Sequence, residues 1–200
     1  MSTDNIVFRN VNVTFRREEG DLTVFEKLNL EIDPTAFTVL VGKSGCGKTT
    51  LLRLIAGLEK PTAGEVILPE GFSVGMMFQE ARLMPWLTCE KNVMLGLDKS
   101  KKREAEEILK MVGLQGFEKA YPAQLSGGMK QRAALARTLI RRSNLILMDE
   151  PFSALDGATR RQMQQELLKI REQTGAGVVF VTHDIEEATF LGDRIITVSG

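Results

Sequence analysis

The segment from Gly42 to Thr49 reads GKSGCGKT, and it restricts the fold of this 200-residue chain more than any other feature. An apolar run from Phe37 to Val41 precedes the segment and predicts a buried strand. Leucine and isoleucine recur at helical spacing after it, and Gly57 stands where a helix would end with a positive φ. The pattern therefore predicts a strand, a glycine-rich loop and a helix in direct succession.

A loop of this composition at the start of a helix is suited to binding phosphate. Its backbone N–H groups can approach phosphate oxygens, and the helix N-terminus adds positive partial charge. In the G-x-x-x-x-G-K-[ST] pattern, Lys48 is expected to reach the β- and γ-phosphates and Thr49 to bind Mg²⁺. An ordinary glycine-rich turn is the alternative, and the predicted strand and helix on either side argue against it.

A second apolar run, Leu145 to Met148, ends in the two carboxylates Asp149 and Glu150. Such a run is typical of a strand that is buried on both faces. Neighbouring side chains of a strand point in opposite directions, so the two acids should have different roles. We expect Asp149 to hold Mg²⁺ and Glu150 to polarise an attacking water. A solvated strand end is the alternative, and the phosphate loop favours the functional interpretation.

The segment Leu125 to Arg132 reads LSGGMKQR and predicts a second site for an anion. Ser126 has the character of a helix N-cap, and Gly127 and Gly128 leave backbone amides uncovered at the start of a helix. Two phosphate-binding ends in one small chain need an explanation if the chain binds one nucleotide.

With these motifs the chain resembles the ATP-binding cassette (ABC) ATPases, in which LSGG followed by a basic helix is the signature. The resemblance implies an α/β fold: a P-loop NTPase core of mainly parallel sheet, an N-terminal antiparallel β subdomain and an inserted α-helical subdomain. It implies one domain over residues 1–200, with the core at 1–80 and 144–200 and the helical subdomain at 81–143.

The resemblance also implies a head-to-tail homodimer, or a pseudo-symmetric dimer, that encloses two ATP molecules. Each signature would contact the γ-phosphate held by the partner's phosphate loop, in a closed two-fold arrangement. The chain would be an ATPase that uses ATP and Mg²⁺ and releases ADP and phosphate.

Further site residues follow from the resemblance, position by position. Gln79, after the run from Ser73 to Phe78, looks like the glutamine that senses Mg²⁺ and water. The segment from Ser153 to Asp156 resembles the loop that crosses the dimer interface. His183, the one histidine of the chain, resembles the switch histidine at the γ-phosphate. Phe15 occupies the family's position for stacking on adenine, with Phe25 as a rival.

The expected catalytic residues are Glu150, His183, Gln79 and Lys48. The expected metal site consists of Thr49, Gln79 and Asp149. The residues expected to contact the nucleotide are Phe15, Gly42, Lys43, Ser44, Gly45, Cys46, Gly47, Lys48, Thr49, Thr50, Ser126, Gly127, Gly128 and Asp156.

Composition agrees with a globular chain that buries a core, since 43% of its residues are hydrophobic, and it argues against several other classes. The chain has 26 Lys plus Arg and 26 Asp plus Glu, so no overall field attracts nucleic acid. No apolar run reaches the length of a membrane span, and the polar start lacks the features of a signal peptide. We expect a subunit that is soluble when isolated and acts at the cytoplasmic face of the cell membrane.

The segment from Gln79 to Thr88, QEARLMPWLT, is the most discriminating within the family. It is similar to the ATPase subunits of importers for nitrate, sulfonates and taurine. The resemblance implies membrane permease subunits as partners and, indirectly, a solute-binding protein. Trp86 and its apolar neighbours Leu83, Met84 and Leu87 would contact the permease; alternatively, Trp86 packs inside the helical subdomain.

Two other function classes remain open from the sequence. A soluble ABC ATPase of cofactor assembly, DNA repair or ribosome action would share every ATP motif. A small-molecule P-loop kinase would share Lys48 and Thr49, but it would have no use for the LSGG segment.

Overall fold

Two β-sheets form the frame of the molecule, and the computed structural model describes residues 4–18, 20–153 and 155–199. The antiparallel sheet has the order β2 (Leu22–Ile32), β1 (Ile6–Phe15) and β4 (Ala63–Ile67). The parallel sheet has the order β5 (Val74–Met77), β6 (Leu145–Asp149), β7 (Gly177–Thr182), β3 (Phe37–Val41) and β8 (Arg194–Thr197).

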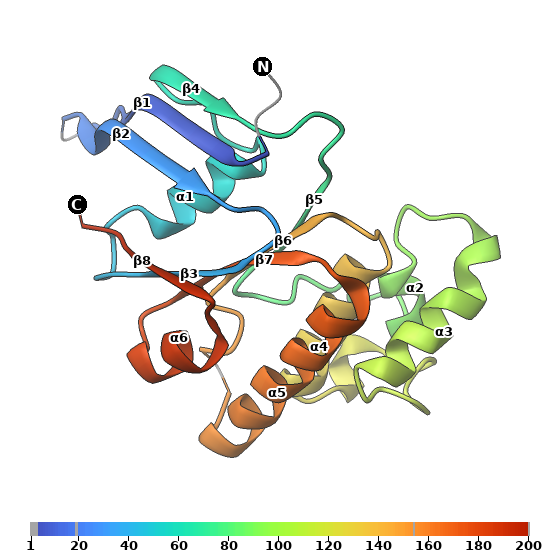
Figure 1. The fold of residues 1–200 in the computed structure, drawn as a ribbon. Helices are drawn as coiled ribbons and strands as arrows, with labels where there is room; N and C mark the ends of the chain where they lie inside the picture. Colours follow the sequence, from blue (N-terminus) through green and yellow to red (C-terminus); the bar gives the residue numbers. More distant parts are fainter. Residues whose placement is uncertain (1–3, 19, 154, 200) are drawn as a thin grey trace.

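The helices cover both faces of the parallel sheet (Figure 1). One helix, α1 (Lys48–Ile55), lies between the antiparallel and the parallel sheets. The opposite face carries α4 (Gly127–Leu139), α5 (Gly157–Thr174) and α6 (Ile185–Leu191). To one side lie α2 (Cys89–Val93) and α3 (Lys102–Met111). Short 3₁₀ turns occur at Lys99–Lys101 and Pro122–Gln124.

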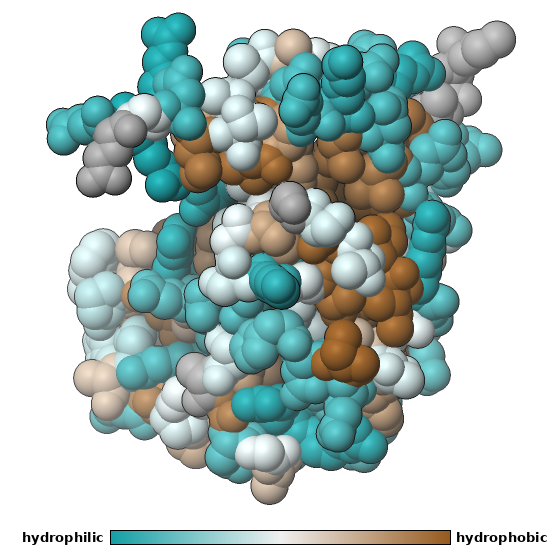
Figure 2. Space-filling model, turned by 90° about the vertical axis from the view of Figure 1, so that its left-hand side faces the viewer, coloured by the Kyte–Doolittle hydropathy of each residue, from teal (hydrophilic) through white to brown (hydrophobic). Residues whose placement is uncertain are grey.

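The apolar strands fit this layered arrangement because their side chains alternate between two hydrophobic clusters. Leu145, Leu147 and Val179 pack with α1 and the antiparallel sheet. Met148 and Phe180 pack on the other side, with α4 and α5. Figure 2 shows hydrophobic side chains gathered below the hydrophilic upper rim of one face, at the level of α1 and β8.

The strand pairing collects the functional loops at one edge of the sheet. All pairs among β5, β6, β7, β3 and β8 are parallel. Their carboxyl ends therefore share an edge, which is where open α/β sheets bind ligands. The glycine-rich loop follows β3, and Gln79, Glu150 and His183 follow β5, β6 and β7.

The expected α/β fold is confirmed, including the buried strand before Gly42, the helix after it and the N-terminal antiparallel sheet. Residues 81–143 contain α2, α3 and α4 joined by turns. In the ranges that the structure describes, no helix is both long and apolar enough to cross a membrane.

Candidate nucleotide-binding site

The glycine-rich loop has a backbone shape that its glycines permit. Gly45 and Gly47 have φ values of +82° and +98°, in the left-handed region that side chains disfavour. A Cβ atom on Gly47 would lie 2.5 Å from Cζ of Phe25, so the β2 side chain leaves no space for a larger residue. The antiparallel sheet thus helps to set the position of the loop.

Lys48 is a buried cation without an acidic partner among the described residues. It is 5% exposed, and its Nζ donates hydrogen bonds of 2.8 Å to the carbonyl oxygens of Gly42 and Lys43. A buried charge is costly unless it is paired, and no ion pair among the described residues includes this amine. An anionic phosphate at the loop would supply the missing negative charge.

Asp149 and Thr49 meet beside this loop. The Thr49 hydroxyl donates to Oδ1 of Asp149 at 3.1 Å and joins the start of α1 to the end of β6. Burial raises the pKa of Asp149, the hydrogen bond from Thr49 opposes this shift, and the nearby Glu150 charge adds to it. A cation would stabilise this carboxylate, so the hydroxyl and carboxylate pair fits a hard oxygen-binding ion such as Mg²⁺.

Glu150 is directed away from the strand by a sharp turn in the backbone. Its φ is +44°, and its N–H donates to the carbonyl of Val181 at 3.1 Å. The carboxylate Oε2 lies 3.4 Å from Nδ1 of His183, whose side chain is 67% exposed. The adjacent acids Asp149 and Glu150 therefore have different neighbours, as expected, but the cause is the turn at Glu150 rather than strand alternation, because β6 ends at Asp149.

Gln79 lies close to the same group of residues. Its Nε2 donates to the Ser153 hydroxyl at 3.3 Å, and this hydroxyl donates to the carbonyl of Glu150 at 3.0 Å. These bonds link the loops that follow β5 and β6, and the contact between Glu150 and His183 extends the connection to the loop after β7. The sequence did not assign a bridging role to Ser153.

The signature segment begins α4 as expected. The Ser126 hydroxyl accepts a hydrogen bond from the N–H of Met129 at 3.2 Å, so Ser126 is the N-cap. A Cβ atom on Gly127 would meet nothing within 4 Å, whereas one on Gly128 would lie 3.2 Å from Cγ2 of Thr159. In the described part of the chain, no hydrogen bond or ion pair joins Ser126 to the phosphate loop.

A family model described as ABC transporter matches residues 25–153, which is more than half of the chain. The chain belongs to this family. The ABC chain is 53% identical over 179 residues to an aliphatic sulfonates import ATP-binding protein of Shouchella clausii, covering 90% of this chain and 72% of the relative. It is 46% identical over 202 residues to an uncharacterized ABC transporter ATP-binding protein of Methanocaldococcus jannaschii, covering 95% and 76%.

A solved structure supports the same assignment. A dimeric ATP-binding cassette in a post-hydrolysis state, bound to ADP and Pi, superposes with a TM-score of 0.85 at 36% identity. The match covers 97% of the ABC chain and 94% of that chain. The family and the fold expected from the sequence are both confirmed.

The two aromatic candidates for adenine stacking have different surroundings in the ABC chain. Phe25 is 5% exposed, and its ring is packed against Gly47. Phe15 is half-buried at the end of β1, where it pairs with Leu22 of β2. Phe15 therefore remains the candidate with an available surface.

Asp156 has a structural partner that the sequence did not reveal. Its carboxylate accepts hydrogen bonds from the Thr159 N–H at 3.0 Å and from the Thr159 hydroxyl at 2.7 Å, and it caps α5. The backbone bond from Thr159 is the main reason why the pKa of Asp156 is lowered. Ala154, in the same expected interface loop, lies outside the described residues.

Trp86 is 71% exposed, so the expectation that it packs inside the helical segment is wrong. The turn that carries it is held from within by Asn92, which is fully buried. The Asn92 amide accepts from the N–H of Met84 at 2.7 Å and donates to the carbonyl of Leu87 at 3.0 Å. The exposed indole is therefore attached to a well-defined backbone.

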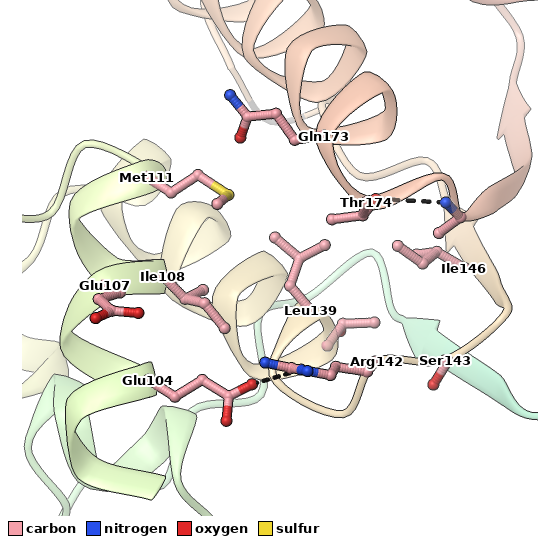
Figure 3. Close-up of a pocket in the computed structure, with 12 residues that line it drawn as sticks. Glu104, Glu107, Ile108, Met111, Leu139, Arg142, Ser143, Ile146, Gln173 and Thr174 are labelled. Atoms are coloured by element: carbon pink, nitrogen blue, oxygen red, sulfur yellow. Dashed lines mark hydrogen bonds and ion pairs between the residues drawn. The ribbon is translucent and has the colours of Figure 1, made fainter.

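A separate cavity of about 400 Å³ contains none of the expected site residues (Figure 3). It lies between α3, the end of α4 and the end of α5, and Ile146 near the start of β6 contributes to its wall. Arg142 and Glu104 form an ion pair of 2.7 Å across one end. This cavity is at the amino end of β6, away from the nucleotide edge.

Replacement of Gly47 tests the steric account of the phosphate loop. We expect Gly47→Ala to weaken ATP binding by about tenfold or more, because the added methyl group displaces either Phe25 or the loop. Gly45→Ala is the matched control, since its Cβ would meet nothing within 4 Å although its φ is also positive. Titration with a fluorescent ATP analogue measures the affinity of each variant. Equal affinities for Gly47→Ala and Gly45→Ala would contradict the steric role of Gly47.

Proposed function

We propose that the ABC chain is the ATP-hydrolysing subunit of a membrane importer for a small organic solute. The chain is an ATPase by family. The observation that carries the mechanistic proposal is the arrangement at the sheet edge, where Lys48, the Thr49–Asp149 pair and the Glu150–His183 pair occupy neighbouring strand ends.

ATP binding would use the phosphate loop and one aromatic side chain. The loop amides and Lys48 would hold the β- and γ-phosphates, with Thr50 in the first turn of α1, and adenine would stack on Phe15. Thr49, Asp149 and Gln79 would hold Mg²⁺, directly or through water. The bound metal would neutralise phosphate charge and orient the γ-phosphate.

Hydrolysis requires a water molecule positioned in line with the bond to the γ-phosphate. The Glu150 carboxylate would accept a proton from that water while water oxygen bonds to the γ-phosphorus and ADP leaves with the former bridging oxygen. His183, next to Glu150, would stabilise charge on the transferred phosphoryl group. The products are ADP and inorganic phosphate.

The signature would complete the active site of a partner subunit. Ser126 and Gly127 lie at the start of α4, and Gly127 leaves open space where a side chain would stand. Uncapped amides at a helix N-terminus attract phosphate. In a head-to-tail dimer these groups would contact the γ-phosphate held by the other subunit, together with the loop around Asp156.

The permease contact would involve Trp86 in the segment between Gln79 and α2. A large exposed aromatic side chain on a fixed turn is typical of an interaction site. Among the nitrate-like, sulfonate and taurine solutes expected from the sequence, the relatives named as aliphatic sulfonates import proteins support a sulfonate. The subunit would then act at the cytoplasmic face of the membrane, with a solute-binding protein as an indirect partner.

Replacement of the proposed base tests the hydrolytic mechanism. We expect Glu150→Gln to lower kcat by about 10² or more, because the amide cannot accept the proton from water. ATP binding should remain, and the ATP-bound dimer should accumulate in size-exclusion chromatography. Asp184→Asn is a control from a neighbouring acid outside the proposed chemistry. Hydrolysis by Glu150→Gln at the control's rate would refute the role of Glu150.

Replacement of Trp86 tests the permease contact. Affinity purification of the wild-type chain from native membranes should recover a permease, and Trp86→Ser should reduce this recovery by about tenfold because a large apolar contact is lost. Leu58→Ser is the matched control, since Leu58 is also exposed, at 60%, but lies outside residues 79–88. Recovery of soluble partners alone would overturn the importer assignment.

A further inference from the structure

We propose that Arg137 is a positioning residue for ATP hydrolysis, which attaches the backbone after Gln79 to the helix that begins at Ser126. Gln79 and Ser126, which we propose to act at nucleotide sites, would then keep a fixed position relative to each other. The inference rests on the proposed roles of Gln79 and Ser126.

The Arg137 guanidinium binds two consecutive carbonyl groups. Its Nη1 donates to the carbonyl of Arg82 at 2.9 Å, and its Nη2 donates to the carbonyl of Ala81 at 2.8 Å. The side chain is half-buried, and none of the ion pairs among the described residues includes it. In this structure its guanidinium therefore binds the backbone of this segment rather than an acidic side chain.

A second side chain of α4 binds the same segment from a neighbouring turn. Gln131 is 6% exposed, and its Nε2 donates to the carbonyl of Gln79 at 2.7 Å. Gln131 and Arg137 are separated by about 9 Å along the helix axis, at 1.5 Å per residue. Two attachment points at this separation restrict both the position and the direction of residues 79–82.

The segment between these contacts has an unusual backbone that the contacts help to maintain. Arg82 has a φ of +45°, which is uncommon for a residue with a side chain. Its guanidinium lies 4.2 Å from the centre of the Phe78 ring. Further along, Asn92 of α2 binds the backbone of Met84. The main chain from Gln79 to Met84 is thus held by α4 and α2.

The Gln79 side chain is bound differently from its backbone. The carbonyl bonds to Gln131 of α4, whereas the side-chain amide bonds to Ser153, which follows β6. Gln79 therefore connects the helical segment with the catalytic edge of the sheet. If α4 shifts relative to that edge, the backbone contacts require Gln79 to follow α4, and its contact with Ser153 changes.

Arginine is suited to this role because of its geometry. Its planar guanidinium carries several N–H donors in a rigid fork, so that it can reach two neighbouring acceptors at once. A lysine ammonium at the same position could contact one carbonyl but would not fix the direction of the segment. An apolar side chain would leave both carbonyls without this partner.

Steady-state kinetics and nucleotide titration test the proposal. We expect Arg137→Met to lower kcat by about tenfold or more, because a misplaced Gln79 would reduce turnover. The Kd for ATP should change by less than about twofold. Arg137→Lys should recover part of the loss. Arg141→Met is the matched control: Arg141 lies in the turn directly after α4 and donates to the carbonyl of Leu95 at 2.7 Å, but it makes no hydrogen bond to residues 79–82.

A double-mutant cycle separates positioning from a general loss of structure. Gln79→Ala should lower kcat, and the addition of Arg137→Met should lower it further by less than about threefold, since both changes remove the same function. If the fold-losses in kcat caused by Gln79→Ala and Arg137→Met multiply in the double variant, the two residues act independently and the proposal is overturned. Unchanged kcat in Arg137→Met would also overturn it.

Hydrogen exchange of the backbone supplies a readout that does not depend on activity. Arg137→Met should increase exchange at the amides of residues 79–84, and Arg141→Met should leave them at the wild-type rate. If Gln79→Ala hydrolyses ATP normally, the proposed role of Gln79 fails. In that case, the exchange measurement still decides whether Arg137 holds residues 79–84 in place. Unchanged exchange in Arg137→Met would show that Arg137 does not hold them. Gln131→Met provides a second variant that removes the neighbouring contact.

Discussion

Parallel pairing of β5, β6, β7 and β3 is the constraint on which the rest of the site depends. It brings four strand ends to one edge, although the residues concerned are far apart in the sequence. The hydrogen bond between Thr49 and Asp149, at 3.1 Å, and the contact between Glu150 and His183, at 3.4 Å, both form across this edge. A change in strand order would separate these pairs without altering any motif.

The parts of the site that the sequence predicted are those encoded over short distances. The phosphate loop needs glycine at Gly47 and a helix after Lys48, and both requirements appear within a few residues. Ser126 likewise caps a helix that begins at the next residue. The glycine pattern, the N-cap residue and apolar periodicity were sufficient for these two assignments, whereas Gln79, His183 and Phe15 were expected only from the resemblance to the family.

Contacts between distant segments were not predictable in the same way. Arg137 binds carbonyl groups 55 and 56 positions earlier in the chain, and backbone acceptors have no sequence signature. The role of Ser153 depends on its hydrogen bond with Gln79, which is distant in the sequence. Asp156 was expected at the dimer interface, but its carboxylate also caps α5 within the subunit. The sequence left two alternatives for Trp86, and the structure shows its side chain 71% exposed on a turn whose backbone is bound by Asn92.

The two helix starts that we propose to bind phosphate have unequal surroundings within one subunit. The first has the buried charge of Lys48, whereas the second has the Ser126 cap and an open position at Gly127. In the head-to-tail dimer that we propose, the two helix starts belong to two halves of a shared site, which would explain why a chain of this size contains both. Through Gln131 and Arg137, the helix of the second half also contacts the segment that follows Gln79.

Mixing two inactive variants tests the shared site most directly. Lys48→Ala removes the phosphate contact, and Ser126→Arg blocks the signature, so each homodimer should hydrolyse ATP at a small fraction of the wild-type rate. A mixed dimer contains one site with an intact phosphate loop and an intact opposing signature. The account predicts that mixing the two proteins restores ATP hydrolysis. A mixture as inactive as its components, or a fully active Ser126→Arg homodimer, would contradict it.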